Sequence, residues 1–111
     1  MNEEDREQTA LFEWAEYKHL DLIFHIPNGS NKSITQAVKF KRMGLKSGVP
    51  DIFLAIPMNG FHGLFIEMKA KKGVISPTQK EWLKRLNEQG YKAVVAKGFD
   101  EAVKVIEEYM K

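Results

Sequence analysis

The dipeptide Asn59-Gly60, between two apolar runs, constrains the fold of this chain more than any other feature of its sequence. Residues 49–56 precede the turn at 57–60 and residues 63–69 follow it. Asn-Gly in this setting is a strong signal for a β-hairpin. Asn59 is also the midpoint between Asp51 and Glu67. An antiparallel return therefore brings these two acids side by side at the open end of the hairpin.

Two carboxylates and an ammonium group meet at that open end. Lys69 follows Glu67 by two residues, so both side chains point to the same face of the strand. Oxygen ligands suit a hard divalent cation, so Asp51, Glu67 and the backbone carbonyl of Met68 form a candidate site for Mg²⁺ or Mn²⁺. Lys69 is a candidate catalytic residue that would steady the charge of a phosphodiester transition state. The alternative is a structural pair in which Lys69 only neutralises Glu67.

Further candidates lie on the flanking elements. Gln79 comes directly after a helix start at Ser76-Pro77, where it can bond to a phosphate, a water or the catalytic lysine. The first predicted helix offers Glu4 as an additional metal ligand, with Glu7 as its competitor. His25 is interpreted as a structural strand residue, with metal binding as the alternative.

The charge distribution favours an anionic partner. The net charge is only +2, but residues 32–72 carry eight Lys or Arg against two acids, which are the proposed ligands. A basic region around an acidic pair suits an anionic polymer bound near a metal. The alternative is a set of solvated surface lysines. The candidates for contact with DNA are Asn28, Lys39, Lys41, Arg42, Lys46, Lys71 and Lys72.

Composition limits the remaining classes of protein. The 111 residues suit a single domain, 1–111, and 43% hydrophobic residues are enough for a core. The chain has no cysteine, which excludes disulfides, thiolate metal sites and cysteine nucleophiles. No apolar run approaches the roughly 20 residues that span a bilayer. An acidic N-terminus is the wrong start for a secretory signal, so we expect a cytoplasmic protein without a membrane partner.

The apolar patterning predicts an α/β sandwich with the order αβαββαβα. Helices are predicted at residues 3–19, 33–43, 76–89 and 100–110, and strands at 22–26, 49–56, 63–69 and 91–96. The hairpin then lies at the centre of a small mixed sheet, with helices available for both faces. Trp14, Trp82 and Phe99 are interpreted as core residues, because their apolar neighbours recur at helical spacing, and base stacking is the alternative.

These residues together resemble a known family. Val49-Pro50-Asp51 followed by Ile66-Glu67-Met68-Lys69 resembles the signature of the PD-(D/E)xK nucleases. Three more segments extend the likeness over nearly the whole chain: His25-Ile26-Pro27-Asn28-Gly29, residues 40–51 and Ser76-Pro77-Thr78-Gln79-Lys80-Glu81-Trp82. In this order they resemble the stand-alone VRR-NUC nucleases of phages and prophages.

The resemblance implies a restriction-endonuclease-like fold and a metal-dependent nuclease. Asp51 and Glu67 would bind the metal, Lys69 would be the catalytic lysine and Gln79 would accompany them. The acid on the first helix would be Glu4 or Glu7. Compact members of this family resemble Holliday-junction resolvases, which act as homodimers on branched DNA, and the location implied is the cytoplasm of a bacterial host.

We therefore expect a Mg²⁺- or Mn²⁺-dependent DNA endonuclease that is selective for branched DNA. Two symmetric cuts in a four-way junction require two sites, which a two-fold dimer supplies. The apolar candidates for its interface are Leu20, Leu22, Phe61, Leu64, Tyr109 and Met110. The alternatives are a catalytically silent DNA-binding module of the same fold and a domain with a purely structural or protein-binding role.

Overall fold

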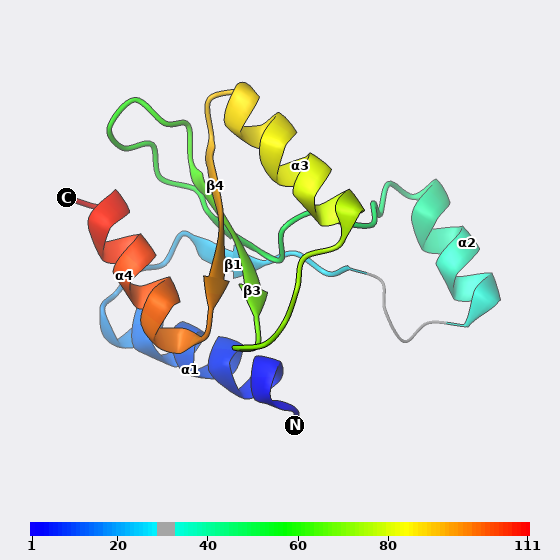
Figure 1. Ribbon diagram of the computed structural model, residues 1–111, viewed down its shortest axis with the longest axis horizontal. Coiled ribbons are helices and arrows are strands. Elements are labelled where there is room, and N and C mark those ends of the chain that lie inside the picture. Colours follow the sequence, from blue (N-terminus) through cyan, green and yellow to red (C-terminus); the bar gives the residue numbers. More distant parts are fainter. Residues whose placement is uncertain (29–32) are drawn as a thin grey trace.

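The predicted hairpin lies at the centre of a four-stranded mixed sheet in the computed structural model, which describes residues 1–28 and 33–111 (Figure 1). The elements along the chain are α1 (Glu3–Tyr17), β1 (Ile23–His25), α2 (Ile34–Arg42), β2 (Ile52–Leu54), β3 (Leu64–Lys69), α3 (Pro77–Glu88), β4 (Lys92–Lys97) and α4 (Phe99–Tyr109). The predicted order αβαββαβα is confirmed. The polar turn expected at residues 27–29 lies partly outside the described residues.

The strand order is β1-β2-β3-β4, with β1–β2 and β2–β3 antiparallel and β3–β4 parallel. Ile52 pairs with Ile66, and one further step in this register places Asp51 opposite Glu67. The predicted register of the hairpin is therefore confirmed. Strand β2 is shorter than the predicted segment 49–56. Pro50 has no N–H to donate to a ladder, so the pairing with β3 begins after it and Asp51 lies at the strand end.

The tip of the hairpin is a tight turn from Met58 to Phe61, which exchange backbone hydrogen bonds of 3.2 and 2.8 Å. Its central residues Asn59 and Gly60 have positive φ angles of 53° and 85°, the backbone that Asn-Gly adopts most readily. The Asn59 amide also donates to the Tyr109 carbonyl at 3.1 Å. The turn is thus fixed to α4 as well as to its own strands.

Helices α1 and α4 cover one face of the sheet, and α3 packs beside β4 on the other (Figure 1). The core between α1, α4 and the sheet contains Leu11, Ala15, Ile52, Leu54, Leu64, Ile66, Met68, Ala102 and Ile106. Trp14 and Phe99 pack at its margin, as predicted. No helix in the described parts of the chain is long and apolar enough to cross a membrane.

Two sequence interpretations are corrected by this packing. Trp82 is only half-buried and does not belong to the core cluster, because α3 contributes no fully buried residue. Leu64 and Tyr109 have exposures of 0% and 2%. Both are occupied by the core of the same chain, so they cannot supply an interface with a second copy.

Helix α2 stands apart from this arrangement. It projects away from the sheet and the other helices (Figure 1) and none of its residues is buried. The helix is stabilised locally: the Ser33 hydroxyl accepts from the Gln36 N–H, and the Gln36 side chain accepts from the Ser33 N–H. Such a capping box satisfies free donors at the helix start without tertiary contacts.

Candidate active site

Asp51 and Glu67 are buried together at the end of the hairpin, with exposures of 6% and 4%. Backbone contacts fix Asp51. Asp51 is held between the buried residues Pro50 and Ile52, and its Oδ1 accepts a hydrogen bond of 3.0 Å from the Met68 N–H. The N–H and C=O of one strand residue point to the same side of the strand. The Met68 carbonyl therefore also faces the side on which Asp51 lies.

A third carboxylate reaches the pair from α1. One carboxylate oxygen from each of Glu4, Asp51 and Glu67 lies within 4.8 Å of the others. Glu7 points elsewhere: its Oε1 lies 3.1 Å from the position that a Cβ on Gly98 would take. The structure thus brings Glu4, and not Glu7, to the two sheet acids. We call Glu4, Asp51 and Glu67 the acidic cluster.

The ionised form of the acidic cluster is unfavourable in this environment. Burial raises the pKa of Asp51 to about 6, and the charge of Glu4 adds to the rise, although the bond from Met68 opposes it. Burial and the charge of Asp51 raise the pKa of Glu67 to about 8, against the lowering effect of Lys69. Removing carboxylates from water disfavours their charged form, as does like charge nearby. Positive charge added between these oxygens would relieve both effects.

Lys69 and Gln79 both contact Glu67. The sequence predicts Lys69 beside Glu67, whereas for Gln79 it predicts a phosphate, a water or the lysine as partner, and the structure gives Glu67 instead. The Lys69 Nζ lies 3.9 Å from Glu67 Oε2, and its side chain is 16% exposed. The Gln79 Nε2 donates to the same Glu67 oxygen at 3.3 Å. Gln79 is oriented by the start of α3, where its Oε1 accepts from the Ser76 N–H at 2.8 Å. One glutamine side chain therefore caps the helix and positions the acid.

His25 supports the site from the neighbouring strand. Its ring Nδ1 lies 2.9 Å from the backbone carbonyl of Asp51. The same nitrogen lies 3.0 Å from the Gln8 Nε2, so the ring of His25 links α1 to the backbone of Asp51. The structural interpretation of His25 agrees with this bond. Its link to Asp51 joins residues 26 apart in the chain, and the sequence contains no local signal for it.

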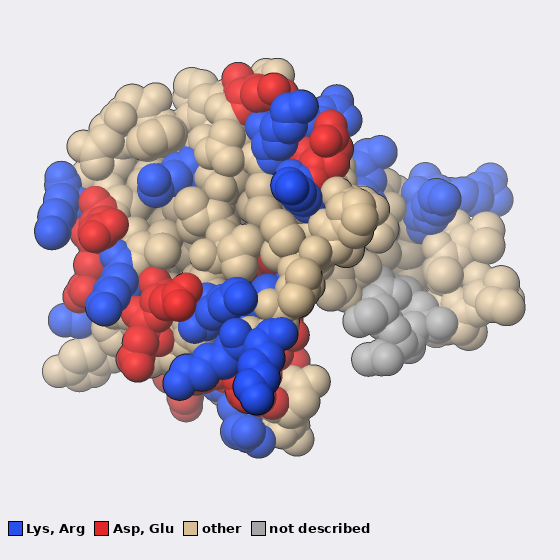
Figure 2. Space-filling view, in the orientation of Figure 1, with Lys and Arg blue, Asp and Glu red and all other residues tan. Residues whose placement is uncertain are grey.

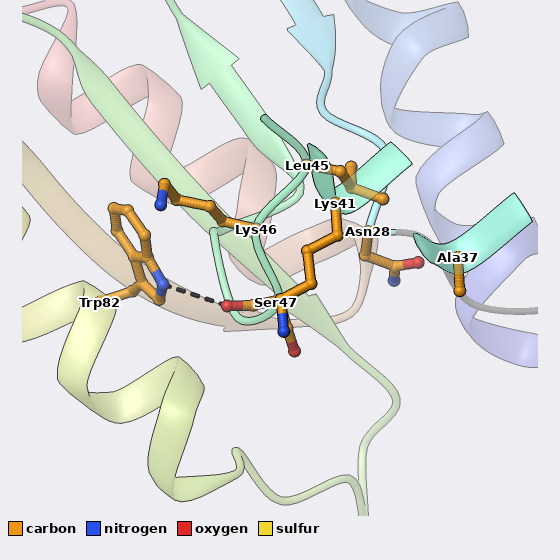
Figure 3. Close-up of a pocket in the computed structure, with 7 residues that line it drawn as sticks. All are labelled: Asn28, Ala37, Lys41, Leu45, Lys46, Ser47 and Trp82. Carbon is orange, nitrogen blue, oxygen red and sulfur yellow. Dashed lines mark hydrogen bonds between the residues drawn. The ribbon is translucent and has the colours of Figure 1, made fainter. Parts of the chain in front are cut away.

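The basic candidates fall into two groups. Lys39, Lys41 and Arg42 occupy the last turn of α2, and Lys46 follows that helix in the chain. Lys71 and Lys72 come directly after β3 and are exposed. Figure 2 shows basic side chains both on the projecting helix and on the body of the molecule. Asn28 lies beside the first group, where it lines a cavity with Lys41 and Lys46 (Figure 3).

The comparisons with known proteins agree with this geometry. The family model of the VRR-NUC domain matches residues 2–100. A solved structure described as a VRR_NUC domain protein is 38% identical and superposes with a TM-score of 0.88, covering 99% of this chain and 89% of that one. No curated protein matches the chain. The fold, the acidic cluster and the family match agree, and the chain belongs to the VRR-NUC family of nuclease domains.

Proposed function

We propose that this protein is a Mg²⁺- or Mn²⁺-dependent DNA endonuclease. The observation that carries the proposal is the acidic cluster itself: three carboxylate oxygens within 4.8 Å of one another, two of them on buried groups, beside the ammonium of Lys69. Buried carboxylates without a compensating charge are costly. A cation bound between these carboxylates would supply the compensating charge.

The donor set fits a hard divalent cation. Asp51, Glu67 and Glu4 offer carboxylate oxygens, and the Met68 backbone carbonyl is a fourth oxygen donor on the same side of β3. Mg²⁺ and Mn²⁺ prefer such ligands, and Mg²⁺ needs only one or two protein carboxylates because it retains several waters. When bound, the cation supplies Lewis acidity, which neutralises phosphate oxygens and makes water more acidic.

The side chains divide the remaining work. Lys69 places an ammonium beside Glu67 and stabilises negative charge that develops on the phosphate. Gln79 holds the Glu67 carboxylate, and the Met68 N–H and His25 hold Asp51. Water attacks the phosphorus in line, the bond from phosphorus to the 3′ oxygen breaks, and the products are a 3′-hydroxyl and a 5′-phosphate.

DNA is the proposed substrate, and the basic side chains support this choice. Lys39, Arg42 and Lys46 extend along or beside the projecting helix, while Lys71 and Lys72 immediately follow the catalytic strand. Contacts of this kind hold the phosphate backbone without reading sequence. Asn28 adds an uncharged polar contact near Lys46.

We further propose that the protein acts on branched DNA, including four-way junctions, as a homodimer. The described residues of one chain form one acidic cluster, which would cut one strand, whereas resolution of a junction needs paired cuts related by two-fold symmetry. The edge strand β1 supports an interface between copies, because Phe24 within it is 48% exposed and Leu22, which directly precedes it, is 55% exposed. The interface residues are thus expected at this edge and not in the buried core.

The test is a cleavage assay with a panel of labelled four-way junctions, flaps, nicked duplexes and plain duplexes. We expect cleavage with Mg²⁺ or Mn²⁺ and none with EDTA, and a mass measurement should give a dimer. Asp51→Ala, Glu67→Ala and Lys69→Ala should each abolish cleavage and leave DNA binding largely intact. Glu4→Gln should reduce cleavage, and Glu7→Gln is its matched control on the same helix.

Four outcomes would contradict the proposal. Cleavage that is unchanged by EDTA would exclude the metal, and full activity of Lys69→Ala would remove its assigned role. A chain that binds junctions but cleaves none of the panel with either cation would be a catalytically silent DNA-binding module. Failure to bind any DNA at low salt, where phosphate contacts are strongest, would leave only a structural or protein-binding role.

A further inference from the structure

A cavity of about 520 Å³ opens between α2, α3 and the segment that connects α2 to β2. None of the acids of the acidic cluster lines it, and the DNA contacts proposed above use Asn28 and Lys46 but not its aromatic wall. Its lining residues are Asn28, Ala37, Lys41, Leu45, Lys46, Ser47 and Trp82 (Figure 3). Its volume lies in the range that holds small organic ligands.

The aromatic wall of the cavity is held in place. The Trp82 Nε1 donates to the Ser47 carbonyl at 3.1 Å, so one edge of the indole is bonded to the connecting segment. Gly48 has a φ of +92°, and a Cβ there would lie 3.0 Å from Trp82 Cδ1 and 2.5 Å from Thr78 Cγ2. The backbone thus packs closely against the base of the ring. A half-buried indole in a fixed orientation is a suitable surface for stacking a planar group.

The polar lining selects an anion. Lys41 and Lys46 are the charged side chains among the described residues that line the cavity, and none of these residues is an acid. In Figure 3 both lysines lie between Trp82 at one end and Asn28 with Ala37 at the other. A ligand with a flat aromatic part and a nearby phosphate satisfies both the indole and the ammonium groups. A nucleotide has this combination.

Two parts of the chain connect the cavity to the acidic cluster: α3, whose Gln79 contacts Glu67, and the segment that leads from α2 to Asp51. Trp82 follows Gln79 by three residues on α3, a rise of about 4.5 Å along the helix. Ser47 precedes Asp51 by four residues, so their Cα atoms are at most about 14 Å apart. A strand whose phosphate lies at Asp51 and Glu67 can therefore deliver a neighbouring nucleotide to Trp82.

We propose that this cavity binds one unpaired nucleotide of the DNA substrate, close to the phosphate that is cut. Its base stacks on Trp82 and its phosphate contacts Lys41 and Lys46. Paired bases inside a duplex do not offer a free face, so the cavity makes the enzyme selective for DNA with an unpaired nucleotide at the branch. This inference rests on the proposed nuclease function and names the feature of the substrate that it recognises.

The test measures binding in EDTA, so that no DNA is cut. The probe is a short labelled duplex with a single unpaired nucleotide beside a nick, compared with the same duplex carrying an abasic residue at that position. Loss of base stacking by alanine substitution weakens binding by about five- to 150-fold. We therefore expect Trp82→Ala to bind the first probe about tenfold more weakly, while its affinity for the abasic probe matches that of the wild type.

Three further variants make the result specific. Trp82→Phe should keep most of the preference for the base, which also guards against a loss of folding in Trp82→Ala. Lys46→Ala should weaken both probes by a similar factor, because it removes a phosphate contact. Tyr17→Ala is the matched control, since Tyr17 is an exposed aromatic residue on α1 and should leave both affinities unchanged.

The proposal would be overturned if Trp82→Ala lost the same affinity for both probes, or lost affinity for neither. Competition by free dAMP at the same concentration as the probe with the unpaired nucleotide would also overturn it, because the ligand would then be a free nucleotide. The nuclease function is tested independently of this nucleotide site. If the wild-type protein prefers the base-containing probe but cuts no DNA in Mg²⁺, the nucleotide site stands and the nuclease function is refuted. If it cuts DNA without any preference for the base, the nuclease function stands and the nucleotide site is refuted.

Discussion

Replacing Glu67 with glutamine is expected to stabilise the metal-free protein while it removes activity. Glu67 is buried beside Asp51 and Glu4, and its pKa is raised to about 8 from an ordinary value of 4.5. Glutamine has nearly the same shape and can still accept the Gln79 hydrogen bond, but it carries no charge. The variant therefore removes the cost of a buried carboxylate without opening a cavity.

The size and sign of the effect follow from linkage. Below pH 4.5 the carboxyl is protonated in both the folded and unfolded protein, so it contributes no difference. Between pH 4.5 and about 8 the unfolded chain loses its proton first, and the wild type becomes less stable as pH rises. One unit of pKa corresponds to about 1.4 kcal/mol. The cost at pH 7 is then about 3 kcal/mol, equivalent to about 10 °C in Tm for a domain of this size.

The assay is urea or thermal denaturation of the wild type and Glu67→Gln in EDTA, at pH 4, 7 and 9. We expect the two free energies of unfolding to agree at pH 4 and the advantage of the variant to grow up to about pH 8. The matched control is Glu81→Gln on the exposed surface of α3, which should change stability by less than about 0.5 kcal/mol.

The reasoning would be refuted if Glu67→Gln and the wild type showed the same dependence of stability on pH. It would also be refuted if the variant were less stable than the wild type at pH 9. Either result would mean that the ionised Glu67 is well solvated or well paired in the folded protein, and that the acidic cluster has no need of a cation.

Three other perturbations test separate parts of the account. Mn²⁺ should raise the Tm of the wild type in a thermal scan, more at pH 8 than at pH 6 because protons compete for the carboxylates, and should leave Asp51→Ala unchanged. Gly48→Ala should lower the free energy of unfolding, measured in urea, by about 1–3 kcal/mol, because the φ of Gly48 is +92° and the new methyl would lie 2.5 Å from Thr78 Cγ2. Gly44→Ala is its control and should lower it less, because Gly44 has a φ of +108° but no neighbouring atom within 4 Å of a new methyl. Lys39→Ala combined with Arg42→Ala should reduce the slope of log affinity against log salt by about 2, and an unchanged slope would exclude both from DNA contact.

The hairpin and its paired acids were predictable because the information is local. Asn59-Gly60 defines the turn, and the symmetric positions of Asp51 and Glu67 about it define the register. Gln79 was predictable for a similar reason. It lies three residues after the helix cap Ser76, so its side chain returns to the helix start, which follows β3 in the chain.

The choice between Glu4 and Glu7 was not predictable, because it depends on how α1 is rotated against the sheet. Both acids lie within one turn of the same helix, and only the packing of Leu11 and Ala15 into the core fixes the rotation. The link from His25 to Asp51 is likewise a consequence of strand pairing between distant segments.

Trp82 was assigned wrongly because periodicity reports which residues share a helix face and not what covers that face. Helix α3 is amphipathic, but one end of its apolar face meets the connecting segment at Ser47 and a cavity instead of a full core. The exposed helix α2 could not be foreseen for the same reason: its pattern suits packing, and the structure leaves it without a buried residue.

The central claim is that Glu4, Asp51 and Glu67 together hold a divalent cation. Crystals soaked in manganese, measured for anomalous scattering, test it most directly. The account predicts an anomalous peak bonded to the Asp51 and Glu67 carboxylates, with Glu4 and the Met68 carbonyl nearby. A soaked crystal with no peak among these side chains, or with manganese bound only elsewhere on the protein, would contradict it.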